Sequence, residues 1–157
     1  MIFFGIDPGF TGAIAIYHPA KHWLEVHDMP TLVAAKGKQE LDHFSVLNLL
    51  EAEDLAERHT VWLEKVGARP GQGVSSMFRF GQQLGALEMA AAAHGHQLRY
   101  VTPAKWKGHF GLSASKGAAR GVAMQRFPQL AQRFARAKDD GRAEAALIAL
   151  YGAEVTR

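Results

Sequence analysis

The stretch FFGIDPGFTGAIAIY, residues 3–17, decides the fold of this chain. An apolar run ends in a single carboxylate, Asp7, and a second apolar run begins after a Pro-Gly turn and Gly12. Two apolar runs separated by such a turn predict a β-hairpin. The charge at the strand end has two explanations, because aspartate before Pro-Gly is a common turn residue and is also a ligand of hard metal ions.

The rest of the chain alternates between short strands and helices. Strands are expected at residues 2–7, 12–18, 22–29, 60–64 and 97–101, and helices at 41–58, 76–94, 103–107, from Ser113 or Ser115 to Pro128, and at 142–152. Residues 31–39 and 65–75 are expected to be loops. Strands joined through helices are expected to be parallel, with right-handed crossovers. The sequence therefore predicts an α/β fold with a mixed five-stranded sheet, three antiparallel strands followed by parallel ones, and helices on both faces.

The length and composition narrow the class of protein. A chain of 157 residues suits one domain, so residues 1–157 are interpreted as a single domain. The absence of cysteine excludes a disulfide framework and a thiolate metal site. The N-terminus lacks the features of a signal peptide, and the apolar runs are too short to span a bilayer. We therefore expect a soluble cytoplasmic protein with no membrane partner.

The charges are distributed unevenly along the chain. Residues 1–63 hold nine acidic residues and four lysines or arginines, whereas residues 65–138 hold twelve lysines or arginines and one acid, Glu88. Such a block can be a solvated face that keeps the protein soluble. The near-absence of compensating acids favours a polyanionic partner, and hence a nucleic acid.

A second carboxylate follows the same pattern as Asp7. Glu64 ends the strand expected at residues 60–64, and that strand is expected beside the first one. The carboxyl ends of neighbouring parallel strands meet at one edge of the sheet, where ligand sites lie. Two carboxylates at one edge repel each other unless a cation lies between them, and Mg²⁺ prefers oxygen ligands. A solvated glutamate is the alternative explanation.

The last helix carries the remaining candidate acids. Asp140 and Glu144 are four residues apart and therefore face the same way on a helix. Either Asp139 or Asp140 can instead cap the helix. Glu144 opens an otherwise apolar run, and a carboxylate on a core-facing helix needs a partner such as a metal ion. Four carboxylates of this kind can hold two metal ions about 4 Å apart, which activate water for hydrolysis of a phosphodiester.

Five segments together resemble the RuvC-like Holliday junction resolvases of the ribonuclease H-like superfamily. They are FFGIDPGFTGAIAI (3–16), VWLEKV (61–66), SMFRFGQQLGALE (76–88), VTPAKWKGHFGLSASKGAAR (101–120) and DDGRAEAALIAL (139–150). The similarity is weakest at residues 19–58 and 127–137. The short chain and the VTPAKWK segment are most similar to the compact resolvases of phages, which implies the cytoplasm of a bacterium or of a phage-infected cell.

The resemblance implies a homodimer that binds four-way DNA junctions. It implies paired nicks in two opposed strands with Mg²⁺ or Mn²⁺, two ions per site, and products with 5′-phosphate and 3′-hydroxyl ends. Asp7 and Glu64 match the first two acids of the family, and Glu144 matches the last. Asp140 is the expected partner of Glu144, although Asp139 remains an alternative because some members space this pair differently.

The resemblance also assigns basic residues. Lys116 matches a residue expected near the scissile phosphate, and Lys105 or Lys107 matches a second. From the basic block as a whole, the residues expected to contact nucleic acid are Lys65, Arg69, Arg79, Lys105, Lys107, Lys116 and Arg120. Trp106 lies between two of these lysines, so it is either a core residue or a DNA contact.

The sequence differs from the family pattern at one position. Better-known bacterial members carry an aromatic residue soon after the second acid, and this residue inserts into the junction. The corresponding stretch, EKVGARPGQG (64–73), contains no aromatic residue. Either Met77 or Phe78 takes this role, or the chain has no such wedge.

The sequence thus favours a metal-dependent endonuclease that resolves Holliday junctions. Asp7, Glu64, Asp140 and Glu144 are the expected metal ligands, and Lys116 is expected to stabilise charge on the phosphate or leaving group. Two alternatives remain: a ribonuclease H-like nuclease for RNA or other branched DNA, and a non-catalytic module that binds junctions.

Overall fold

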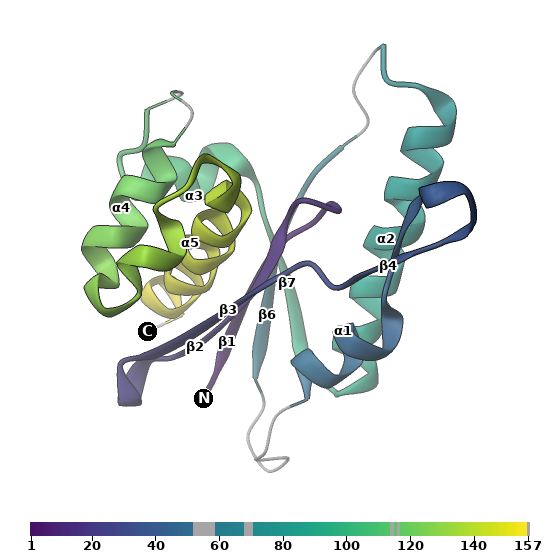
Figure 1. Ribbon diagram of the computed structural model, residues 1–157. Helices are drawn as coiled ribbons and strands as arrows, with labels where there is room; N and C mark the ends of the chain where they lie inside the picture. The colour runs from purple at the N-terminus through teal and green to yellow at the C-terminus, as the bar shows by residue number, and fades with distance from the viewer. Residues whose placement is uncertain (52–58, 68–70, 114, 116, 157) are drawn as a thin grey trace.

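The computed structural model describes residues 1–51, 59–67, 71–113, 115 and 117–156. Its centre is a five-stranded sheet in the order β3-β2-β1-β6-β7 (Figure 1). The strands are β1 (Phe3–Asp7), β2 (Ala13–His18), β3 (Trp23–Asp28), β6 (Thr60–Glu64) and β7 (Gln97–Val101). β2 pairs antiparallel with both β1 and β3, whereas β6 pairs parallel with both β1 and β7. This mixed sheet confirms the fold class that the sequence predicts.

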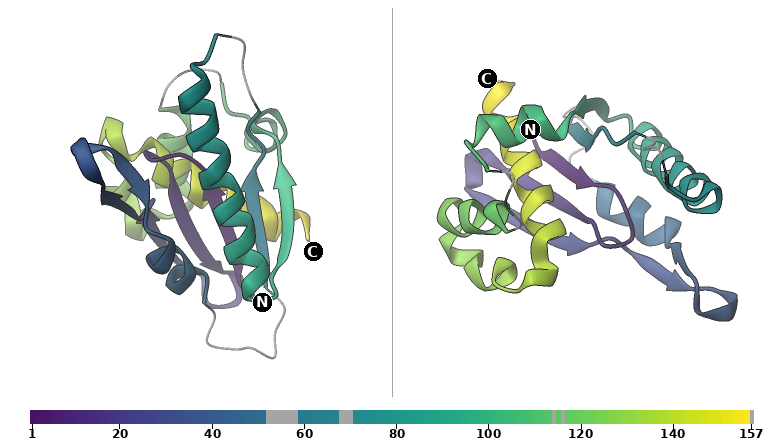
Figure 2. Two further views of the ribbon diagram at one scale, coloured as in Figure 1. Left: turned by 90° about the vertical axis from the view of Figure 1, so that its right-hand side faces the viewer. Right: turned by 90° about the horizontal axis from the view of Figure 1, so that it is seen from above.

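Helices cover both faces of the sheet, as Figures 1 and 2 show. One face carries α1 (His43–Leu50) and α2 (Val74–Ala93), and the other carries α3 (Pro103–His109), α4 (Ala118–Arg126) and α5 (Asp140–Val155). Successive side chains of β1 point to opposite faces of the sheet and therefore belong to two hydrophobic cores. Phe3 packs in the core under α5, and Phe4 packs in the core under α1 and α2. Among the described residues, no helix has the length and apolar character needed to span a bilayer.

Small residues let α5 lie directly on the sheet. A Cβ atom on Gly5 of β1 would collide with the backbone of Ala145 and Ala149, and one on Gly141 would collide with the backbone of Thr11. Glycine at these positions permits contact between the backbones of helix and strand. This close approach carries the first turns of α5 to the end of β1 that bears Asp7.

Three segments differ from the expectations of the sequence. Residues 31–39, expected as a loop, contain β4 (Thr31–Val33) and the start of β5 (Gln39–Leu41), which form a separate two-stranded sheet. Lys36 and Gly37 have positive φ angles at the turn between them. The strands are short and mostly exposed, so they lack the apolar alternation that predicts a strand.

The helix expected at residues 41–58 is shorter among the described residues. α1 begins after Asp42, whose side chain accepts a hydrogen bond from the backbone N–H of Ser45 over 3.1 Å. It ends at Leu50, because Glu51 has an extended backbone. Residues 52–58 lie outside the described residues.

The C-terminal third follows the predicted order with shifted boundaries. α4 begins at Ala118, after Gly117 with a φ of 82°, rather than at Ser113 or Ser115. Pro128 does interrupt this helix, and a 3₁₀ helix follows over Pro128–Phe134. α5 begins at Asp140, two residues before the predicted start, which places Asp140 in its first turn.

Candidate metal centre at the carboxyl ends of the central strands

Three carboxylates from distant parts of the chain meet at one edge of the sheet. Asp7 ends β1 and Glu64 ends β6, and these strands run parallel with Ile6 opposite Leu63. Glu144 reaches the same point from α5. One oxygen atom from each carboxylate can be chosen so that all three lie within 4.8 Å of one another. The structure therefore brings together three of the four acids that the sequence singled out.

Three ionised carboxylates this close together and partly buried are energetically unfavourable unless a cation neutralises them. Burial, together with the neighbouring charges of Glu144 and Glu64, raises the pKa of Asp7 to about 8, although Lys107 acts to lower it. Glu64 is only 6% exposed. A carboxyl group that holds its proton near neutral pH beside two other carboxylates indicates a site short of positive charge.

The donor set fits a divalent metal ion. All three ligand groups are carboxylates, which are hard oxygen donors of the kind that Mg²⁺ and Mn²⁺ prefer. Among the described residues, the positive charge at the cluster comes from Lys107, whose Nζ atom donates a hydrogen bond to Glu144 Oε1 over 2.8 Å. One lysine does not balance three carboxylates, so a divalent cation would remove the excess negative charge.

Trp106 is hydrogen-bonded to one member of the acidic cluster. Its side chain is fully buried, and its indole Nε1–H donates a hydrogen bond to Glu64 Oε1 over 2.8 Å. Of the two roles left open by the sequence, the structure therefore places Trp106 in the core. The contact with Glu64 was not predicted, although a buried indole N–H needs an acceptor and thus signalled one.

Asp139 and Asp140 lie in different environments. Asp139 is 1% exposed and accepts hydrogen bonds from the backbone N–H of Arg136 over 2.9 Å and from its guanidinium over 3.0 Å. A second guanidinium, that of Arg142, lies 3.4 Å away. Hydrogen bonds from Arg136 hold the pKa of Asp139 below its ordinary value. These contacts hold Asp139 in place at the start of α5.

Asp140 lies beside the cluster and is paired with an arginine. Its Oδ1 atom accepts a hydrogen bond from Arg120 Nε over 2.7 Å. Asp140 and Glu144 line one cavity of about 160 Å³, together with Lys107. Asp140 therefore shares a face of α5 with Glu144, as predicted, but does not belong to the group of three acids.

The predicted nucleic-acid contacts fall into three groups. Lys65 and Lys105 are exposed. Arg79, Lys107 and Arg120 have intramolecular partners, namely the carbonyl oxygen of Gln39, Glu144 and Asp140. Lys116 and Arg69 lie outside the described residues.

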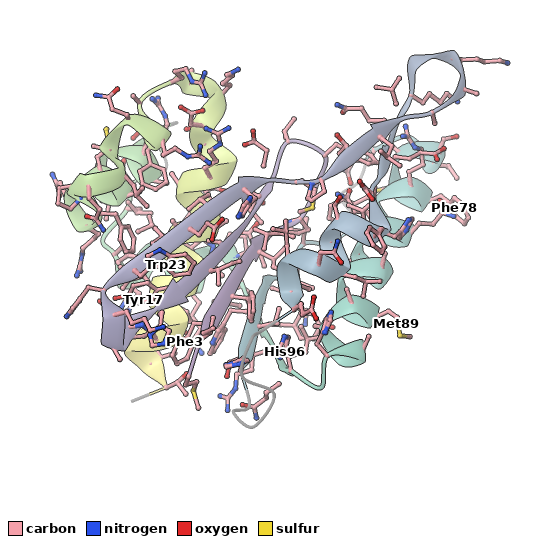
Figure 3. All side chains as sticks on the ribbon, turned by 60° about the horizontal axis from the view of Figure 1, so that its bottom comes forward. Phe3, Tyr17, Trp23, Phe78, Met89 and His96 are labelled. Atoms are coloured by element: carbon pink, nitrogen blue, oxygen red, sulfur yellow. The ribbon has the colours of Figure 1, made fainter. Side chains whose placement is uncertain are left out.

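The two candidates for a junction wedge lie near the start of α2. Phe78 is 67% exposed and projects away from the sheet (Figure 3). Met77 is partly buried and lines a cavity. Phe78 therefore has the exposure that a wedge needs, and its role stays a prediction.

Comparisons with known proteins give matches in structure. No family model and no curated protein matches the sequence. A structure described as T. thermophilus RuvC in complex with Holliday junction substrate matches with a TM-score of 0.61 and 19% identity, over 99% of this chain and 96% of that one. A second Thermus thermophilus RuvC structure matches with a TM-score of 0.56 and 21% identity, over 99% and 97% of the two chains.

A viral protein has the same architecture. The crystal structure of the fowlpox virus Holliday junction resolvase matches with a TM-score of 0.53 and 16% identity, over the full length of both chains. The three matches cover nearly all of this chain, including the strands and the helix that carry the acidic cluster. The chain therefore has the RuvC-like form of the ribonuclease H-like fold, which its sequence predicts.

Proposed function

We propose that this chain, as a single nuclease domain of residues 1–157, is a metal-dependent DNA endonuclease that resolves four-way junctions. The observation that carries the proposal is the meeting of Asp7, Glu64 and Glu144 at the end of the central strands. The fold, shared with proteins described as Holliday junction resolvases, supports the choice of substrate. The block of basic residues between 65 and 138 supports binding to the DNA backbone.

Asp7, Glu64 and Glu144 would hold Mg²⁺ or Mn²⁺. When bound, the metal would supply an activated water and neutralise charge on the scissile phosphate. Asp140 is the candidate fourth ligand, because it shares a cavity with Glu144. To help hold two ions, Asp140 would have to give up its hydrogen bond from Arg120 and bind a cation in its place.

The residues around the cluster would prepare it for this chemistry. Trp106 holds the Glu64 carboxylate in one orientation. Asp7 would release its proton when a cation enters, because the charge of the cation would offset the burial and the neighbouring carboxylates that raise the pKa of Asp7. Lys107 would keep a positive charge close to the phosphate, and Lys65 and Lys105 would contact the backbone of the DNA. Lys116 remains the proposed stabiliser of the leaving group.

Cutting two opposed strands requires two active sites, so we propose that the protein acts as a homodimer. The products would be nicked duplexes with 5′-phosphate and 3′-hydroxyl ends. Sedimentation of the protein with and without a four-way junction would give the number of chains in the complex. A single chain bound to each junction would contradict this part of the proposal.

A competition among substrates tests the substrate class. The wild-type protein is mixed with equal amounts of a four-way junction, a flap, a linear duplex and an RNA–DNA hybrid, each with its own label. The proposal predicts that the junction is cut first. Equal cleavage of the duplex, or faster cleavage of the hybrid, would instead indicate a nuclease with another substrate. Tight binding without cleavage in Mg²⁺ and Mn²⁺ would indicate a binding module.

A further inference from the structure

A second feature lies next to the acidic cluster, on the side of the sheet that carries α2. It is a cavity of about 310 Å³. Its lining includes Gly9, two residues after Asp7, and Val66, two residues after Glu64. A ligand in this cavity would therefore lie beside the loops that leave both strand-end acids.

The side chain of Gln83 makes this cavity unusual. Gln83 lies on α2, is 3% exposed and lines the cavity. Among the described residues, neither its amide nitrogen nor its amide oxygen has a hydrogen-bond partner. Buried polar groups are nearly always hydrogen-bonded, because an unmade bond is costly. An amide kept in this state is expected to meet its partner in a ligand.

The other walls favour a flat aromatic ligand over a phosphate group. Phe10 and Phe80 contribute aromatic rings. Arg79 is the cation in the lining, and it is already engaged, because it lies 5.1 Å from the centre of the Phe10 ring and donates to the carbonyl oxygen of Gln39. Mostly apolar walls with a few polar groups are typical of sites that bind small organic ligands.

We propose that the cavity receives an unpaired nucleobase of the bound DNA strand and that Gln83 recognises the edge of that base. The inference rests on the proposed function, because the cavity adjoins the candidate metal centre and a branched DNA has bases that can leave the stack. The cavity is within the size range of small-ligand sites, which begins at about 300 Å³. A glutamine amide offers one donor and one acceptor side by side, which matches the N6 and N7 atoms of adenine. Stacking on Phe10 or Phe80 would hold the ring.

The test uses a substitution that preserves volume. Gln83→Met removes both hydrogen-bonding groups and keeps the side chain long and flexible. The folded protein should gain thermal stability, because an unpaired buried amide is replaced by an apolar group. The matched control is Gln82→Met, at the neighbouring position of α2, where the side chain is exposed.

The first readout is the base preference of cleavage. A set of four-way junctions places each of the four bases at every position within a few nucleotides of the cut. The wild-type protein and Gln82→Met should prefer one base at one position. In Gln83→Met, the ratio between the best and the worst base at that position should fall about tenfold, while the best junction is still cut. An unchanged ratio in a folded Gln83→Met protein would overturn the proposal.

The second readout is independent of cleavage. Short single-stranded oligonucleotides that differ in one base are bound to the protein in Ca²⁺, and their affinities are measured by fluorescence anisotropy. A base preference that Gln83→Met abolishes and Gln82→Met retains supports the cavity as a base site. Equal affinity of the wild-type protein for all four bases overturns it. If the wild-type protein cuts no junction, the proposed function fails, and this binding experiment still decides the role of Gln83.

Discussion

Trp106 and Glu64 lie 42 residues apart in the sequence and are joined by a buried hydrogen bond of 2.8 Å. The bond ties α3 to the end of β6 and fixes one oxygen of a carboxylate that belongs to the acidic cluster. Hydrogen bonds to a metal-ligating group orient that group, and their loss lowers metal affinity or activity by about 10–100-fold. Trp106 is therefore a positioning residue in the proposed site.

Trp106→Phe should slow cleavage by lowering the affinity of the site for Mg²⁺. The apparent affinity for Mg²⁺ should fall about tenfold or more, because Glu64 loses the group that orients it. Raising the Mg²⁺ concentration should restore part of the activity, which a general loss of folding would not allow. The measurement is the cleavage rate as a function of Mg²⁺ concentration.

Trp62→Phe is the matched control for this variant. Trp62 is also buried, but its Nε1 atom has no hydrogen-bond partner among the described residues. This change should cost stability through lost packing and leave the Mg²⁺ dependence unchanged. Equal shifts in Mg²⁺ dependence for both variants would refute the positioning role of Trp106.

Asp7→Asn should stabilise the metal-free protein at alkaline pH. The pKa of Asp7 is about 8 in the folded chain and near 3.9 in an unfolded one. Ionisation of Asp7 therefore leaves stability unaffected below pH 4, lowers it progressively between pH 4 and pH 8, and lowers it by a constant amount above pH 8. The difference between these two pKa values corresponds to about 5–6 kcal/mol, and the asparagine avoids this cost.

Thermal unfolding in EDTA across this pH range measures the effect. The Tm of the wild-type protein should fall toward pH 8 more steeply than the Tm of Asp7→Asn. Addition of Mg²⁺ should raise the Tm of the wild type and have little effect on the variant. Identical pH dependence of the two proteins in EDTA would show that Asp7 ionises freely.

Asp139 and Asp140 should respond differently to the same substitution. Asp139→Asn should cost about 1–3 kcal/mol of stability, because Asp139 is buried and accepts hydrogen bonds from Arg136. Since the pKa of Asp139 is lowered in the folded state, its ionised form stabilises the protein above about pH 4, and this contribution is lost as the pH falls further. Asp140→Asn should leave stability nearly unchanged and lower the cleavage rate.

Unfolding by urea measures the change in stability of each variant. Cleavage assayed at low temperature, where both variants are folded, measures the change in activity. If Asp139→Asn abolished cleavage while it remained folded, the choice of Asp140 as the fourth acid would be wrong.

Gly5→Ala should disrupt the contact that brings Glu144 to Asp7. A methyl group on Gly5 would collide with the backbone of α5, so the helix would have to shift. We expect a loss of about 3 kcal/mol or more and a strong decrease in cleavage. In the control Gly85→Ala on α2, a Cβ atom meets nothing within 4 Å, and stability should rise by about 0.5–1 kcal/mol. Similar stabilities for the two variants would mean that the α5 backbone does not rest on Gly5.

The strand-end acids were predictable from the sequence because each ends an apolar run. Asp7 and Glu64 stand out for this reason, and Glu144 stands out because it opens an otherwise apolar run on the last helix. The parallel pairing of β1 with β6 then places the first two together, as open α/β sheets do. The fold and the core of the candidate site follow from these local patterns.

Other features depend on contacts between elements that local patterns do not encode. The pairing of Arg120 with Asp140 depends on α4 lying against α5, and the contact of Arg79 with Gln39 depends on a hairpin whose strands are only three residues long. Both arginines were predicted as DNA contacts from charge alone. The sequence shows where the charges are, and the packing of helices decides which of them have an intramolecular partner.

The most direct test of the account is cleavage of an immobile four-way junction, labelled in turn on each strand, in Mg²⁺ and in EDTA. The wild-type protein should make paired symmetric nicks only in Mg²⁺. Glu64→Gln and Glu144→Gln should lower the rate by orders of magnitude while both proteins still bind the junction. Glu51→Gln, at an exposed acid beyond α1, should cut like the wild type. Cleavage in EDTA, or full activity of Glu64→Gln, would contradict the proposed metal centre.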